Sequence, residues 1–138
     1  MLFRSVGLVD AGAAVTVHAR RGEQARQVAA ECGATAGEGA TPAPGSWDIL
    51  VNGTPLGGPG HRDASPWPGG RFDGRLVYDL TYGPTETPLL REAREAGCRG
   101  LDGLPMLVAQ AERQFAWWTG RPAPAGVMRA AADARARG

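Results

Sequence analysis

The apolar residues of this chain follow helix-like and strand-like patterns in alternation. Short runs rich in β-branched and aliphatic residues are typical of buried strands, and helical spacing that ends at a glycine is typical of amphipathic helices. The predicted strands are 15–18, 48–51, 76–80 and 98–101. The predicted helices are 23–32, 87–96, 104–118 and 127–137, and residues 4–11 are predicted to form the last turns of a further helix. Such alternation favours a parallel sheet with helices on its faces, closed in the doubly wound manner.

The start of the chain does not carry the phosphate-binding turn of that fold. A dinucleotide-binding fold opens with a strand, a glycine-rich turn and a helix. Here no G-x-G-x-x-G occurs before Gly12, and the first predicted element is the end of a helix. We therefore expect an α/β fold with an incomplete doubly wound (Rossmann-like) parallel sheet, lacking its first strand and glycine-rich loop. Because the first strand is central in the order 3-2-1-4-5-6, its two neighbours would be left with unpaired edges.

The amino-acid composition limits the class of protein, the partners and the chemistry that we expect. The chain has 138 residues, 43% of them hydrophobic, which suits one globular domain. A net charge of +1 does not indicate binding to nucleic acid or to a membrane surface, and there is no apolar run of about 18 residues that would span a bilayer. All 15 basic residues are arginine, so no step of catalysis can use a lysine of this chain. Cys32 and Cys98 lack metal or redox spacing and are expected to be buried hydrophobes in a reducing, cytoplasmic setting.

Polar residues that could bind a ligand follow two of the predicted strands. Arg20 and Arg21 come after the strand 15–18, where guanidinium groups can hold the 2′-phosphate of NADP. Asn52 and Thr54 follow the strand 48–51, at the edge of the sheet where ligands bind, and could hold the ribose or nicotinamide of a cofactor. Two solvated arginines and ordinary turn chemistry are the alternatives for these residues.

Two later segments carry further candidates. Asp79 and Tyr82 lie at and just after the end of the third apolar run. On the helix 104–118, Met106 and Gln110 are four residues apart and share one face. The Gln110 amide could hydrogen-bond a hydroxylated or carboxylated ligand there, with a surface glutamine as the alternative. The apolar stripe of this helix is predicted to consist of Leu104, Leu107, Val108, Ala111, Phe115 and Trp118.

The remaining aromatic and imidazole side chains suggest structural roles. Trp117 and Trp118 are expected in the core or at an interface rather than as a stacking platform for a ligand. His18 and His61 have no partners at metal-ligand spacing, so we expect no metal site.

Taken together, these segments resemble the C-terminal NADP-binding domain of shikimate dehydrogenases, over residues from about 4 to 121. The most specific segment is D-G-L-P-M-L-V-A-Q-A with F-x-x-W-x-G behind it, and N-G-T-P-L-G and Y-D-L-x-Y-x-P-x-x-T-P-L-L add independent support. The resemblance implies reversible reduction of 3-dehydroshikimate to shikimate by NADPH, in aromatic amino-acid (chorismate) biosynthesis, and a homodimer for the full-length enzyme. Residues 1–138 are then expected to form a partial NADP-binding domain, with the N-terminal substrate-binding and catalytic domain absent.

The resemblance also implies roles for individual residues. Tyr82 and Gln110 match positions that contact the shikimate substrate. The positions that match cofactor contacts are Arg20, Asn52, Thr54, Leu80, Gly103 and Met106. Two residues depart from the family pattern near the 2′-phosphate, since Ala19 stands where Asn is frequent and Gln24 where a basic residue is common. Arg21 can compensate for them.

The family places a lysine and an aspartate for proton transfer in its N-terminal domain. We therefore expect no catalytic residue within this chain, and no measurable turnover by the chain alone. Three alternatives stay open: a quinate/shikimate dehydrogenase of the same family, a free-standing non-catalytic nucleotide-binding module, and an unfolded gene remnant. The lack of a phosphate cradle argues against the module.

Overall fold

The computed structural model describes the backbone of residues 2–137 and the side chains of residues 5–135. Its contacts divide the chain into two compact units, one ending at Trp47 and the other beginning at Asp48. The described strands form two sheets, one in each unit, and every strand pair is parallel. The predicted α/β class is therefore confirmed.

The first unit contains two helices and a two-stranded sheet. In chain order these elements are α1 (Leu2–Asp10), β1 (Thr16–Val17), α2 (Gly22–Cys32) and β2 (Thr35–Ala36). Val17, Ala25 and Ala29 form its core. Gly33 ends α2 in the left-handed conformation, with a φ of 69°, and its N–H donates to the Ala29 carbonyl.

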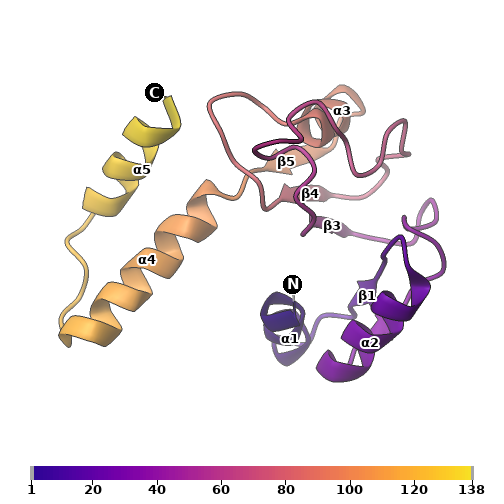
Figure 1. Ribbon diagram of the computed structural model, residues 1–138, viewed down its shortest axis with the longest axis horizontal. Coiled ribbons are helices and arrows are strands. Elements are labelled where there is room, and N and C mark those ends of the chain that lie inside the picture. The colour runs from indigo at the N-terminus through magenta and orange to yellow at the C-terminus, as the bar shows by residue number, and fades with distance from the viewer. Residues whose placement is uncertain (1, 138) are drawn as a thin grey trace. The chain divides into compact units, whose positions relative to one another are not determined.

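The second unit begins with a three-stranded parallel sheet in the order β3-β4-β5 (Figure 1). Its elements are β3 (Ile49–Asn52), β4 (Leu76–Asp79), α3 (Pro88–Glu95) and β5 (Arg99–Leu101). The helix α3 packs on β4 and β5 and buries Leu89 and Ala93, while Val77 is fully buried in the central strand. The order within each sheet is that of consecutive strands in the doubly wound arrangement.

The last two helices, α4 (Leu104–Thr119) and α5 (Val127–Arg137), pack against each other. Figure 1 shows α4 running away from the sheet with α5 beside it. Of the predicted apolar stripe, only Leu104 and Val108 are buried. Trp117 and Trp118 are 82% and 73% exposed, so the expectation that they lie in the core is wrong. Among the described elements α4 contacts only α5, and Trp118, the last residue of the predicted stripe, is exposed.

Local details also differ from the sequence-based expectations. The strand β1 is only two residues long, so His18 lies just beyond it rather than within a buried strand, and β2 was not predicted at all. Cys32 and Cys98 are buried free thiols, as expected. No helix within the described residues is long and apolar enough to cross a membrane.

Candidate functional site

The carboxyl ends of β3 and β4 are joined by a buried polar contact. Asn52 is the last residue of β3 and Asp79 the last residue of β4, and the parallel register places them opposite each other. The Asn52 Nδ2 donates to Asp79 Oδ1 at 2.9 Å. Asn52 is 5% exposed and Asp79 is fully buried. Two polar side chains thus meet inside the edge of the sheet at which ligands bind in this class of fold.

The Asp79 carboxylate accepts further hydrogen bonds from the segment that follows its strand. Its Oδ1 accepts from the backbone N–H and the hydroxyl of Thr81, at 3.1 and 2.9 Å. Its Oδ2 accepts from the Thr87 hydroxyl at 2.6 Å. Thr87 in turn caps α3, since its hydroxyl oxygen accepts from the Leu90 N–H at 3.4 Å. The buried carboxylate is satisfied by hydrogen bonds and fixes both ends of the segment between β4 and α3.

The Asn52 amide also shapes the turn after β3. Its Oδ1 accepts from the Thr54 N–H at 2.9 Å and from the Thr54 hydroxyl at 2.8 Å. Its Nδ2 reaches the Leu56 carbonyl at 3.2 Å. Because both ends of the amide are engaged within the protein, Asn52 holds the turn in shape, while the exposed Thr54 is the side chain of this pair that a ligand can reach.

Two residues predicted to lie near the nicotinamide are adjacent in the structure. Gly103 donates its N–H to the Thr81 carbonyl at 3.1 Å and immediately precedes α4. A Cβ built on Gly103 would stand 2.7 Å from the Leu80 carbonyl carbon and would overlap the carbonyl oxygen. Only glycine therefore allows the start of α4 to approach the end of β4 this closely. Met106, half-buried, and Gln110, exposed, follow on α4.

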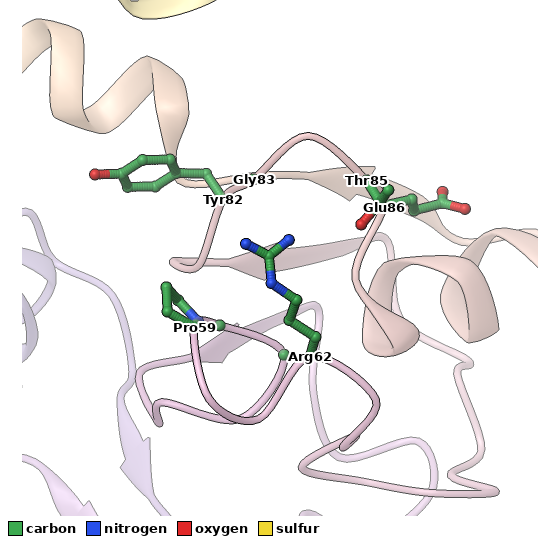
Figure 2. A pocket seen from close by; sticks show the side chains of 8 residues that line it. Pro59, Arg62, Tyr82, Gly83, Thr85 and Glu86 are labelled. Carbon is green, nitrogen blue, oxygen red and sulfur yellow. The ribbon is translucent and has the colours of Figure 1, made fainter. Parts of the chain in front are cut away.

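Tyr82 stands at the rim of two hollows next to this edge. It is 44% exposed and lies three residues beyond the end of β4. The first hollow, shown in Figure 2, is lined by Gly57, Gly58, Pro59, Arg62, Tyr82, Gly83, Thr85 and Glu86. The second is lined by residues 82–87 together with Leu90, Arg94, Gly100 and Asp102. The loop after β3 and the segment 82–86 thus line the first hollow, and the second lies between residues 82–87, α3 and β5.

The two arginines predicted to bind the 2′-phosphate belong to the first unit. Both are exposed and follow the carboxyl end of β1. Arg21 is the N-cap residue of α2, and its carbonyl accepts from the N–H groups of Gln24 and Ala25 at 3.0 and 3.3 Å. The guanidinium groups are therefore accessible next to a helix N-terminus, where an anion is favoured.

The two histidines lie in different parts of the structure, His18 beside β1 and His61 in the loop after β3. Within the described residues no three His, Cys, Asp or Glu side chains gather closely enough to hold a metal ion. His18 packs beside Gly37, with its Nδ1 buried and unpaired. His61 uses its backbone to close the loop after β3, where its carbonyl accepts from Gly57 at 2.9 Å.

Sequence reasoning singled out most of these residues and missed others. It named Asp79 as a candidate at the end of an apolar run but did not predict that its carboxylate links the two loops. It also missed Thr87, whose hydroxyl links the carboxylate to α3. Arg62 lies in a Gly- and Pro-rich loop with no recognisable pattern, and only the structure shows it beside Tyr82.

Known proteins with similar sequences and structures include shikimate dehydrogenases. The family model described as Shikimate 5′-dehydrogenase C-terminal domain matches residues 103–132. The shikimate dehydrogenase (NADP(+)) of Anaeromyxobacter sp. (strain Fw109-5) is 44% identical over 142 residues, covering 94% of this chain and 49% of that protein. The enzyme of the same name from Archaeoglobus fulgidus is 47% identical over 89 residues, covering 64% of this chain and 33% of that protein.

A solved structure agrees with these sequence matches. Shikimate 5-dehydrogenase from Thermus thermophilus, in complex with NADP(H) and shikimate, superposes with a TM-score of 0.79 at 34% identity. The match covers 92% of this chain and 48% of that protein. The chain thus spans about half the length, or less, of the relatives it matches.

Proposed function

We propose, from the similarity of the chain to shikimate dehydrogenases, that it is the NADP-binding part of an enzyme that interconverts 3-dehydroshikimate and shikimate. Relatives named as NADP-dependent shikimate dehydrogenases support the cofactor and the reaction. The observation that carries the proposal is the approach of Gly103 to Leu80, because it brings together two residues that the family resemblance assigns to the nicotinamide.

The residues present fit this cofactor. The Leu80 carbonyl already fills the position that a Cβ on Gly103 would take, so the start of α4 packs directly on the end of β4. We assign the nicotinamide to the neighbourhood of this contact, with Met106 as an apolar neighbour. We propose that Arg20 and Arg21 bind the 2′-phosphate through charge-assisted hydrogen bonds. We propose that the turn containing Asn52 and Thr54 contacts the cofactor at the carboxyl end of β3.

The substrate side of the proposal rests on Tyr82 and Gln110. Both side chains are exposed and carry groups that hydrogen-bond hydroxyl or carboxylate oxygens. When bound, NADPH supplies the hydride for the substrate carbonyl. We assign to the side chains of this chain the binding and orientation of cofactor and substrate, and no proton transfer, since it has no lysine and the family places that step on another domain. We therefore expect no measurable oxidation of shikimate by the chain alone.

Cofactor binding by the chain tests this function directly. We expect NADPH to bind more tightly than NADH, in a fluorescence or calorimetric titration, because only NADPH offers a phosphate to Arg20 and Arg21. The double substitution of both arginines by glutamine should remove the preference, whereas Arg26→Gln, an exposed arginine inside α2, should retain it. Equal affinity of the unsubstituted chain for both cofactors would contradict the 2′-phosphate assignment, and binding of neither would contradict cofactor binding by this chain.

The proposal also includes the cellular location and the oligomeric state of the enzyme. A cytoplasmic location fits the two free thiols. A homodimer is proposed for the full-length enzyme, and sedimentation of that enzyme as a monomer would overturn it.

A further inference from the structure

Thr81, two residues beyond the end of β4, connects three parts of the second unit. Its backbone N–H and its hydroxyl both donate to Asp79 Oδ1, at 3.1 and 2.9 Å. Its carbonyl accepts from the Gly103 N–H at 3.1 Å, at the start of α4. Its methyl group faces the loop after β3, where a Cβ on Gly58 would lie 3.4 Å from Thr81 Cγ2. Thr81 therefore contacts the end of β4, the start of α4 and the loop after β3.

The carboxylate that binds Thr81 is itself held firmly. Asp79 is fully buried, and it also accepts from the Asn52 amide at 2.9 Å and from the Thr87 hydroxyl at 2.6 Å. Those two partners belong to the end of β3 and to the cap of α3. Because Thr81 donates twice to an oxygen that cannot move freely, the backbone of residue 81 is also restrained. The hydroxyl thus helps to keep the Thr81 carbonyl directed at the Gly103 N–H.

The residues assigned to the cofactor and the substrate lie directly beside Thr81. Leu80 precedes it and Tyr82 follows it in the chain. Gly103, which is hydrogen-bonded to Thr81, also packs against Leu80. Figure 2 shows the Tyr82 side chain directed away from the rest of the segment 82–86. The position of Gly103 and the point from which the Tyr82 side chain starts therefore both depend on the backbone of residue 81.

We infer that Thr81 is a positioning residue, whose hydroxyl, anchored on Asp79, holds Gly103 where the nicotinamide binds. The inference rests on the proposed function, which places the nicotinamide beside Leu80 and Gly103. Thr81 acts through Gly103 rather than by touching the ligand. A small displacement of a group that orients a ligand weakens binding, so loss of the hydroxyl should be detected at the nicotinamide end of the cofactor.

Substitution of Thr81 by valine tests the anchoring of Gly103. Valine keeps the shape of threonine but places a methyl carbon where the hydroxyl lies 2.9 Å from Asp79 Oδ1, and carbon and oxygen need about 3.3 Å. We expect hydrogen exchange of the Gly103 amide, followed by NMR, to become about tenfold faster. Exchange of the Cys98 amide, which bonds to the Ala93 carbonyl at 2.9 Å, should not change. Thr81→Ser, which keeps the hydroxyl, should restore slow exchange at Gly103.

Two ligands show whether the effect reaches the nicotinamide. We expect Thr81→Val to weaken NADPH binding about tenfold in a calorimetric titration, and Thr81→Ser to restore it. Adenosine 2′,5′-bisphosphate carries the 2′-phosphate but no nicotinamide. It should bind equally well to both variants, because Arg20 and Arg21 belong to the first unit, whereas unfolding would weaken both ligands. Thr85→Val, at an exposed threonine of the same segment, is the matched control and should change neither affinity.

The outcomes separate this inference from the proposed function. Thr81→Ala removes the hydroxyl without adding a carbon beside the carboxylate, and it should show the same changes if the valine variant does not fold. Unchanged Gly103 exchange, unchanged NADPH affinity, or equal weakening of NADPH and the bisphosphate overturns the inference and leaves the cofactor function standing. If the unsubstituted chain binds no NADPH but Gly103 exchange depends on the hydroxyl, the cofactor function fails and the anchoring of Gly103 by Thr81 stands.

Discussion

The side-chain amide of Asn52 donates a 2.9 Å hydrogen bond to the buried carboxylate of Asp79, across the ends of two neighbouring parallel strands. This contact links the turn after β3 to the segment after β4. The same carboxylate reaches the cap of α3 through Thr87. Both loops that carry the candidate ligand-binding residues are therefore fixed to one buried group, and we expect the shape of the site to depend on it.

Replacement of Asp79 by asparagine tests that dependence. The substitution keeps the size of the side chain but replaces one acceptor oxygen by a donor, so a hydroxyl or amide N–H in the interior loses its partner. We expect the free energy of unfolding in urea to fall by about 2 kcal/mol. Asp48→Asn is the control, because Asp48 is exposed and its contact with Arg75 is 3.7 Å long; the change there should stay within about 0.5 kcal/mol. Equal effects of the two substitutions would show that the network adds little stability.

Substitution of Gly103 by alanine should separate α4 from the end of β4. The added methyl group would overlap the Leu80 carbonyl, and backbone cannot move aside as a flexible side chain can. We expect a loss of stability of about 1–3 kcal/mol and weaker binding of NADPH, measured by urea unfolding and by fluorescence titration. Gly7→Ala, in the helix α1 with open space around it, should instead raise stability by about 0.5–1 kcal/mol. A Gly103→Ala chain with unchanged affinity and stability would contradict the close approach.

The sequence predicted those elements whose structure depends on residues close together in the chain. Apolar runs located β3 and β4 because parallel strands of this class are apolar along their length, although β3 leaves Ile49 56% exposed here. Gly33 and Gly120 marked the ends of α2 and α4 because they take up the left-handed conformation there. The short strand β2 could not be recognised, since two residues carry no periodicity.

The missed features depend on contacts between distant parts of the chain. Helical spacing showed that Trp118 shares a face with Val108, but spacing cannot tell whether anything covers that face, and the structure buries only the first turns of α4. The hydrogen-bond partners of Asp79 come from two places in the chain, Asn52 at the end of β3 and both ends of the segment between β4 and α3. The placement of Arg62 beside Tyr82 likewise requires two loops to meet, which no local pattern encodes.

The exposed tryptophans provide a test of the α4 arrangement. Because Trp117 is 82% exposed, Trp117→Ser should change the free energy of unfolding of this chain by no more than about 0.5 kcal/mol. Leu89→Ala, on the buried face of α3, is the contrasting variant and should lower the free energy of unfolding by about 2–5 kcal/mol. Acrylamide should also quench the Trp117 fluorescence of the unsubstituted chain efficiently. That fluorescence is the difference between the emission of the unsubstituted chain and the emission of Trp117→Ser. A large destabilisation by Trp117→Ser would mean that this face of α4 is covered in solution.

The buried thiol of Cys98 gives the folded chain a pH dependence of definite sign. Burial raises the pKa of this thiol above its ordinary value of 9.0, with the nearby Asp73 acting in the same direction. The sulfur contacts the carbonyl of Gly74 at 3.0 Å, so the protonated form can donate there. Above pH 9 the unfolded chain therefore loses this proton while the folded chain still holds it, and stability must decrease as pH rises through the unfolded pKa.

Unfolding in urea at a series of pH values from neutral to alkaline checks this expectation. The free energy of unfolding should be independent of Cys98 ionisation at neutral pH and should fall above about pH 9. In Cys98→Ser, whose hydroxyl does not titrate in this range but can donate to the same carbonyl, the fall should be smaller. Iodoacetamide should also react with Cys98 more slowly in the folded chain than in the unfolded chain, because only the thiolate attacks. An alkaline loss of stability that is identical in the serine variant would assign the effect to other groups and contradict a raised Cys98 pKa.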